Sequence, residues 1–99
     1  MEIAATSTEY LHVNVVASIG GAPVTLAAPP ELAFLPIGSG SNPVTEDWLT
    51  GEWSGSWARL LLGPNGGTVT LDPGKYSVWI TFAAGLETPV YRAGELTVY

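Results

Sequence analysis

Turn-forming residues interrupt this 99-residue sequence at short intervals, because it contains 12 glycines and 8 prolines. No segment between them has both the length and the apolar pattern of an amphipathic helix. Several segments instead alternate apolar and polar residues, which is the pattern of a strand with one buried face. In residues 10–17, for example, Leu11, Val13 and Val15 fall on one face and His12 on the other. The sequence therefore predicts an all-β fold.

Seven or eight short strands separated by turns are typical of an antiparallel sandwich or barrel. The pair Gly20-Gly21 predicts a hairpin turn, and Gly51 with Gly55 predicts a bulge or an irregular edge. Ninety-nine residues fit one domain, 1–99, in which residues 1–9 are a candidate N-terminal arm. We expect strands at residues 10–17, 31–36, 57–62, 68–71, 75–84, 90–93 and 95–99.

Charge and composition argue against several classes of function. The net charge is −6, and the three basic residues, Arg59, Lys75 and Arg92, are scattered. Nucleic-acid binding needs a cationic face, so we expect no nucleic-acid partner. There is no cysteine, hence no disulfide and no thiolate site. No apolar stretch approaches the roughly 18 residues of a membrane helix and no signal-peptide pattern is present, so we expect a product of the cytoplasm without membrane contact.

The balance of apolar and charged residues points to a protein partner. Charged residues make up 12% of the chain, against about 25% in ordinary soluble domains, while 46% of the residues are hydrophobic. A domain of this size cannot cover that much apolar surface by itself. We therefore expect part of it to contact another chain. The alternative is a weakly charged β protein rich in Thr, Ser and Gly.

One tyrosine follows a turn at the start of a predicted strand, in the segment Asp72-Pro73-Gly74-Lys75-Tyr76. Pro73 presets φ, and Gly74 suits the positive φ of a type II turn. The pattern resembles the tyrosine corner of immunoglobulin-like sandwiches, in which the tyrosine hydroxyl bonds to the backbone a few residues upstream. The antibody cysteine would fall at Val78. The resemblance implies an immunoglobulin-like antiparallel β-sandwich of about seven to eight strands without the disulfide.

Residues 19–99 also resemble small virion structural proteins of tailed bacteriophages, particularly those that infect actinobacteria. The motifs are G-x-P-V-x-L at residues 21–26, a tryptophan-rich middle, P-G-x-Y-x-V-W at 73–79 and E-x-P-V-x-x-x-G at 87–94. The resemblance implies a domain built into a particle, either as a capsid decoration or minor capsid protein or as a tail, baseplate or head-tail connector component. Its location would be the virion, after synthesis in the host bacterial cytoplasm.

No residue pattern indicates catalysis. His12 is the only histidine, lies within a predicted strand and is accompanied by no Gly-x-Ser-x-Gly motif, so we interpret it as a surface or cross-strand residue. The acidic residues Glu46, Asp47 and Glu52 could act as paired carboxylates, but adjacent acids on a loop are usually solvated. Metal-ligand spacings are missing as well. We therefore predict a protein that is not an enzyme and has no metal or cofactor.

Three of the four tryptophans, Trp48, Trp53 and Trp57, lie within ten residues of the chain. Such a group can belong to the core, to a protein interface or to a sugar-binding surface. We expect Trp57 in the core, because it stands beside the segment Ala-Arg-Leu-Leu-Leu at 58–62. Trp79 alternates with Tyr76, which predicts a place on an outer face or under a loop.

These observations lead to a hypothesis of assembly through apolar anchors. The expected partners are other virion proteins, namely the major capsid or tail protein, and further copies of this chain. The polar loop 37–47 is expected to rearrange on docking, and the arm 1–9 to add a strand to a neighbour. The candidate partner-binding residues are Trp48, Trp53, Tyr91 and Tyr99.

Two rival functions stay open from the sequence. One is a carbohydrate-binding module, which predicts that Trp48 and Trp53 are exposed and coplanar. The other is an adhesin or enzyme accessory domain cut from a larger chain.

Overall fold

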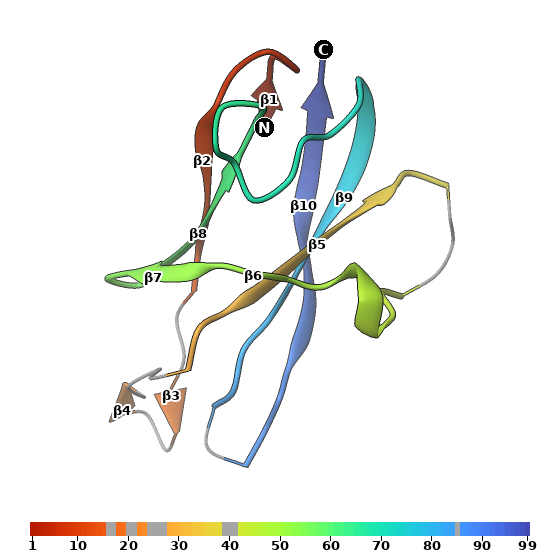
Figure 1. Cartoon of the computed structure of the whole chain (residues 1–99). Coiled ribbons are helices and arrows are strands. Elements are labelled where there is room, and N and C mark those ends of the chain that lie inside the picture. The colour runs from red at the N-terminus through yellow and green to blue at the C-terminus, as the bar shows by residue number, and fades with distance from the viewer. Residues whose placement is uncertain (16–17, 20–21, 24–27, 39–41, 85) are drawn as a thin grey trace.

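The computed structural model describes residues 1–15, 18–19, 22–23, 28–38, 42–84 and 86–99, and it is all-β in two main sheets (Figure 1). The five-stranded sheet contains, in spatial order, β1 (Glu2–Ile3), β10 (Val90–Val98), β9 (Gly74–Thr81), β5 (Glu31–Pro36) and β6 (Leu49–Thr50). The three-stranded sheet contains β2 (Glu9–Asn14), β8 (Trp57–Leu62) and β7 (Glu52–Ser54).

Two smaller elements complete the described chain. The strands β3 (Ser18–Ile19) and β4 (Ala22–Pro23) pair as a short ribbon, whose predicted turn at Gly20-Gly21 lies outside the described residues. A 3₁₀ turn, η1 (Thr45–Asp47), precedes β6. Within the described part of the chain there is no α-helix, and hence no helix that could cross a membrane.

The five-stranded sheet is mixed, which corrects the expectation of purely antiparallel pairing. Residues 2–3 run parallel to Thr97 and Val98, while the other pairs in this sheet are antiparallel. The backbone nitrogen of Thr97 donates to the Met1 carbonyl at 2.9 Å. The N-terminal segment that we expected to act as an arm thus contributes an edge strand to its own sheet.

Most strand positions follow the sequence pattern, but two differ. Residues 68–71 form a single bridge, between Leu62 and Val69, and not a strand. Residues 90–98 form one strand rather than two. A bulge between Arg92 and Gly94 accommodates the glycine without ending the pairing with β9.

Gly51 is the point at which the chain passes from one sheet to the other. β6 ends before it in the five-stranded sheet, and β7 begins after it in the three-stranded sheet. A Cβ at this position would lie 2.7 Å from the carbonyl oxygen of Arg59. The irregularity predicted here therefore has a specific cause, since only glycine allows the backbones to approach this closely.

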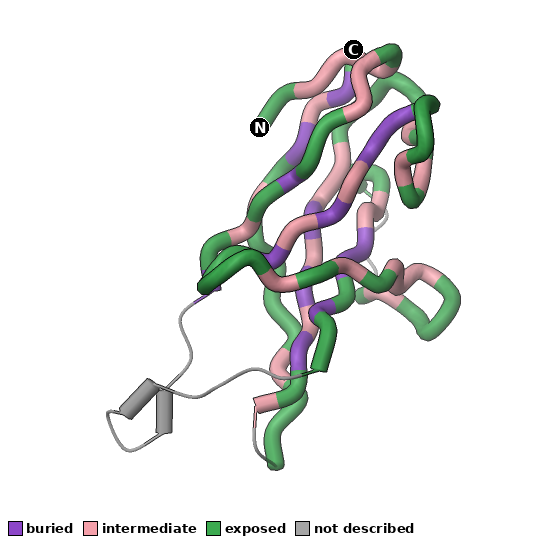
Figure 2. Tube along the Cα trace, turned by 60° about the vertical axis from the view of Figure 1, so that its left-hand side comes forward, coloured by how far each residue is buried: buried purple, intermediate pink, exposed green. Residues whose placement is uncertain are grey.

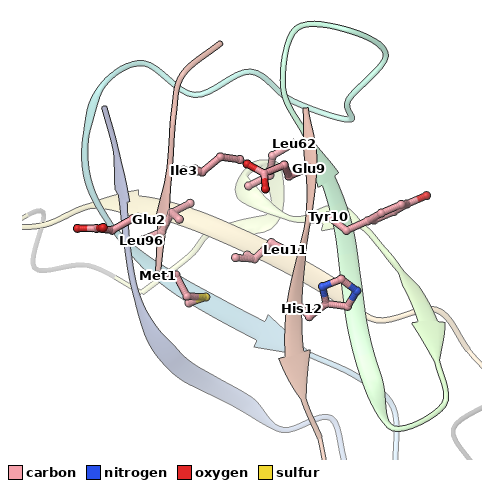
Figure 3. Close-up of a pocket in the computed structure, with 9 residues that line it drawn as sticks. All are labelled: Met1, Glu2, Ile3, Glu9, Tyr10, Leu11, His12, Leu62 and Leu96. Carbon is pink, nitrogen blue, oxygen red and sulfur yellow. The ribbon is translucent and has the colours of Figure 1, made fainter. Parts of the chain in front are cut away.

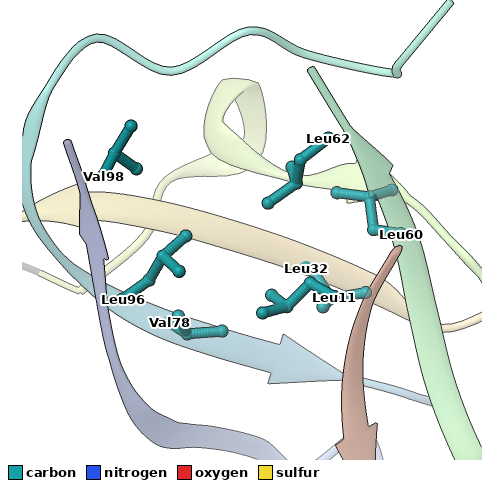
Figure 4. Packing of buried hydrophobic residues seen from close by; sticks show 7 residues of the cluster. All are labelled: Leu11, Leu32, Leu60, Leu62, Val78, Leu96 and Val98. Carbon is teal, nitrogen blue, oxygen red and sulfur yellow. The ribbon is translucent and has the colours of Figure 1, made fainter. Parts of the chain in front are cut away.

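The core consists mainly of aliphatic side chains that both sheets direct toward each other (Figure 4). The buried positions lie on strands of both sheets (Figure 2). Alternation along β9 and β10 buries Val78, Ile80 and Leu96 to within 2% of full burial, as the pattern predicts. The main cluster contains Leu11, Leu32, Leu60, Leu62, Val78, Leu96 and Val98. A second cluster contains Val15, Ala58, Ile80 and Phe82.

The hydrogen bond expected at the tyrosine corner is present. The Tyr76 hydroxyl donates to the carbonyl oxygen of Asp72 at 2.6 Å, and the half-buried ring packs against the main core cluster. Gly74 has φ of +154° as the first residue of β9, so it does not adopt the value of about +80° of a type II turn. Through this hydrogen bond and its ring packing, Tyr76 connects the loop before β9 with the edge of the core.

We predict that Leu32→Ala lowers the free energy of unfolding by about 2–5 kcal/mol, because it leaves a cavity at a fully buried site. Leu86→Ala is the matched control. Leu86 is fully exposed, so its truncation should change stability by less than about 0.5 kcal/mol. Urea unfolding followed by circular dichroism measures both, and equal effects would contradict the assignment of the core.

We predict that Tyr76→Phe lowers the free energy of unfolding by about 0.5–1.5 kcal/mol, the usual contribution of one hydrogen bond. Tyr99→Phe removes the same hydroxyl from a side chain that is 69% exposed, and it should leave stability unchanged. If the two variants unfold at the same urea concentration, the corner does not stabilise the fold.

Candidate functional site

The four predicted anchor residues divide into two half-buried tryptophans and two exposed tyrosines. Trp53 packs edge-on against Phe82, with ring centroids 6.0 Å apart, and its indole nitrogen donates to the carbonyl of Ala28 at 2.7 Å. Trp48 is also half-buried, next to η1. Tyr91 and Tyr99 are 58% and 69% exposed. The structure therefore places Trp53 in internal packing and leaves the tyrosines available for contact.

The expectation that Trp57 belongs to the core is wrong, because its side chain is 45% exposed. The buried residues of β8 are Ala58, Leu60 and Leu62. Since side chains alternate along a strand, Trp57 and Arg59 project from the opposite face. The charged Arg59, two residues after Trp57, was the signal in the sequence that could have placed this ring on the outer face.

The outer surface of the three-stranded sheet carries a group of aromatic rings that sequence reasoning missed. We name Tyr10, His12 and Trp57 the outer aromatic face. The Tyr10 and His12 rings lie 6.1 Å apart, and His12 and Trp57 lie 6.2 Å apart in an edge-on arrangement. These residues come from β2 and β8, 45 or more positions apart in the sequence, so only the antiparallel pairing of the two strands brings them together.

A charged pair adjoins the outer aromatic face. The Arg59 guanidinium lies over the Tyr10 ring, 4.3 Å from its centroid, and its Nε lies 2.8 Å from Oε1 of Glu52. The Nε–H is not aimed at that oxygen, so this contact is an ion pair and not an aligned hydrogen bond. Glu52, which the sequence offered as a possible catalytic carboxylate, is therefore paired with Arg59.

The other two candidate acids, Asp47 and Glu46, lie in the η1 turn. Asp47 Oδ2 accepts a hydrogen bond from the backbone nitrogen of Val44 at 2.9 Å, which closes the η1 turn, and Glu46 is exposed beside it. Among the described residues, no three His, Asp or Glu side chains come together in an arrangement that could hold a metal ion.

Tyr91 belongs to an apolar surface at the end of the β9–β10 hairpin. We name Leu86, Val90 and Tyr91 the hairpin surface, since all three are exposed. The Tyr91 ring is 6.3 Å from Phe82, which joins this surface to the second core cluster. In Figure 1 the β9–β10 hairpin extends beyond the ends of β2 and β8.

Two hollows lie along β2, on the side of the molecule where the two sheets do not meet. One, of about 270 Å³, lies between β1 and β2 (Figure 3). The other, of about 440 Å³, is bounded by residues 13–15 of β2 and by Tyr91, and Ile80 and Phe82 contribute to its lining. Tyr91 of the hairpin surface thus borders a depression of mixed polar and apolar lining that reaches down to the core residues Ile80 and Phe82.

The edge of β10 beside this depression is open. β1 pairs only with Thr97 and Val98, so within the described part of the chain residues 90–94 have no strand on the side away from β9. Such an edge presents unpaired backbone donors and acceptors to another chain. Arg92 and the bulge before Gly94 interrupt the edge and restrict which segments can pair with it.

Trp79 lies where the alternation places it, on the face of β9 away from the core. It is half-buried opposite Ala33 of β5, and Ala33 is fully buried. The Trp79 indole nitrogen is itself buried and has no hydrogen-bond partner among the described residues.

Comparison with known proteins provides no relative from which a role could be inferred. No family model matches the sequence, and no curated protein and no solved structure matches it.

We predict that Trp53→Phe lowers the free energy of unfolding by about 1 kcal/mol, because it removes the hydrogen bond to the Ala28 carbonyl. Trp57→Phe changes an exposed ring and should shift stability by less than about 0.5 kcal/mol. Acrylamide should quench the fluorescence of Trp57 more strongly than that of Trp53. The opposite order in either experiment would place Trp57 in the core after all.

Proposed function

We propose that this chain is a non-enzymatic structural protein of a tailed-bacteriophage virion that binds the capsid surface as a decoration or minor capsid protein and stabilises it. The resemblance over residues 19–99 supports the virion setting. The two-sheet architecture and the Tyr76–Asp72 hydrogen bond support an immunoglobulin-like β-sandwich. The low charge of the chain fits a protein that is covered by a partner on part of its surface.

The observation that carries the docking proposal is the hairpin surface. Leu86, Val90 and Tyr91 are each exposed near the projecting end of the hairpin, with Val90 and Tyr91 on its two opposite faces. The exposed charged residues Glu87 and Arg92 lie beside them. Exposed apolar groups that gather at one place mark interaction sites more often than scattered ones do. Tyrosine is also enriched among the residues that dominate interface energies. We therefore assign Tyr91 as the principal anchor.

The neighbouring features suggest how a partner is held. A side chain of the partner enters the hollow of about 440 Å³, and an extended segment pairs with the open edge of β10 at residues 90–94. Glu87 lines the same hollow and favours a basic residue on the partner. When many copies bind to one particle, modest individual contacts hold firmly because they act together.

A tail, baseplate or head-tail connector component is the second candidate, supported by the same resemblance and using the same docking surface. It differs in copy number. A sugar-binding surface built on Trp48 and Trp53 has less support, because both side chains are half-buried and the Trp53 indole nitrogen is already hydrogen-bonded.

We predict that the protein is present in purified virions of the phage whose genome encodes it, in hundreds of copies per particle. Quantitative mass spectrometry of intact virions measures this number. Tens of copies or fewer would favour the tail or connector role, and absence from the particle would overturn the proposal.

We predict that Tyr91→Ala weakens binding to particles that lack the protein by about 30-fold or more, as the loss of a central interface anchor does. Co-sedimentation over a range of protein concentrations gives the affinity. Tyr99→Ala is the matched control at the opposite end of the molecule, and it should bind like the unaltered chain. Equal affinity of all three proteins would show that the hairpin surface is not the docking site.

A further inference from the structure

The outer aromatic face has features that protein docking through the hairpin does not use. Tyr10 and Trp57 are 43% and 45% exposed, and His12 lies between them in contact with both rings. Figure 3 shows Tyr10 and His12 projecting on the side of β2 opposite Leu11, away from the core. The face belongs to the three-stranded sheet, whereas the hairpin surface belongs to the five-stranded sheet. The two surfaces are therefore separate.

A polar hollow adjoins these rings. Its volume is about 220 Å³, below the roughly 300–1,000 Å³ of sites for drug-sized ligands, which fits a single ring-sized group. Tyr10 belongs to both the aromatic face and this hollow. Other residues in its lining offer donors and acceptors: Thr50, Glu52, Arg59 and Thr68.

The charges in the hollow balance each other. Glu52 and Arg59 form an ion pair at 2.8 Å, and their side chains keep 51% and 31% of their surface exposed. The buried Nε–H of Arg59 has no aligned acceptor among the described residues. A ligand with hydroxyl groups can accept a hydrogen bond from the guanidinium and donate one to the carboxylate at the same time. An anion would be repelled by the negative charge of Glu52.

We propose that the outer aromatic face and this hollow together form a binding site for a neutral saccharide. A sugar ring presents C–H groups on its faces, which pack on aromatic rings, and hydroxyl groups on its rim, which need adjacent donors and acceptors. Trp57 and Tyr10 supply the rings, and the Glu52–Arg59 pair supplies the polar contacts. This site is independent of the proposed docking through the hairpin surface.

Other occupants fit these residues less well. Nucleic acid would need several cations, and Arg59 is the one basic residue here, already paired with Glu52. The centre of a protein interface is usually depleted of charged residues, whereas here the Glu52–Arg59 ion pair lies directly beside the rings. Asn14 and Ser54, opposite Trp57 in the two neighbouring strands, add further polar groups.

The proposal is tested by NMR titration of the ¹⁵N-labelled chain with three probes: cellohexaose, chitohexaose and mannohexaose. With at least one of them we expect the indole N–H signal of Trp57 and the backbone signals of Tyr10 and Arg59 to shift together. Trp57→Ala should weaken that binding by about tenfold or more, whereas Trp57→Phe keeps a ring and should retain most of it. Tyr10→Ala is a second variant at an exposed position.

The control is Tyr91→Ala, which removes an exposed aromatic from the other sheet and should leave sugar binding unchanged. Three results would overturn the proposal: no shift with any of the three sugars at millimolar concentration, shifts confined to other surfaces, or full binding by both Trp57→Ala and Tyr10→Ala. If the Trp57 signal responds to virions but to no sugar, the face is a protein contact instead. None of these results affects the Tyr91 experiment on particle binding.

Discussion

The fold depends on one aliphatic contact between its two layers. Leu60 and Leu62 of the three-stranded sheet meet Leu32 and Leu96 of the five-stranded sheet, and no disulfide supplements this packing because the chain has no cysteine. A domain of this length is stabilised by about 5–15 kcal/mol in total, so a few buried leucines account for much of the difference between folded and unfolded chains. The buried side chains of β8 and β10 hold the two sheets together and so position the outer aromatic face on one sheet and the hairpin surface on the other.

Alternation along the strands decided most of what the sequence could predict. The bounds of β5 and β8 match the expected ranges, and the inward residues of β9 and β10 are those that the pattern indicated. The approach failed at Trp57, because the expectation followed the apolar character of the ring and the neighbouring leucines and not the alternation. The charged Arg59 shares the parity of Trp57 and marks the outer face of β8.

Long-range relations explain the other differences. The sheet change at Gly51 depends on a close approach to Arg59, and the outer aromatic face depends on pairing between β2 and β8. The parallel addition of residues 2–3 to β10 joins the two ends of the sequence. By contrast, the tyrosine corner joins residues only four apart, Asp72 and Tyr76, and a short motif was therefore sufficient to anticipate its hydrogen bond.

The pairing of β1 with β10 also determines at which chain end another protein is best fused. Because β1 runs parallel to β10, the chain leaves after Tyr99 at the end opposite the β9–β10 hairpin, whereas cargo joined before Met1 would run back along β10 toward the hairpin (Figure 1). A fluorescent protein or antigen joined after Tyr99 would extend from that end and leave the hairpin unobstructed. The same cargo joined before Met1 would pull on a two-residue strand, which makes the C-terminal position the better one for labelling or surface display.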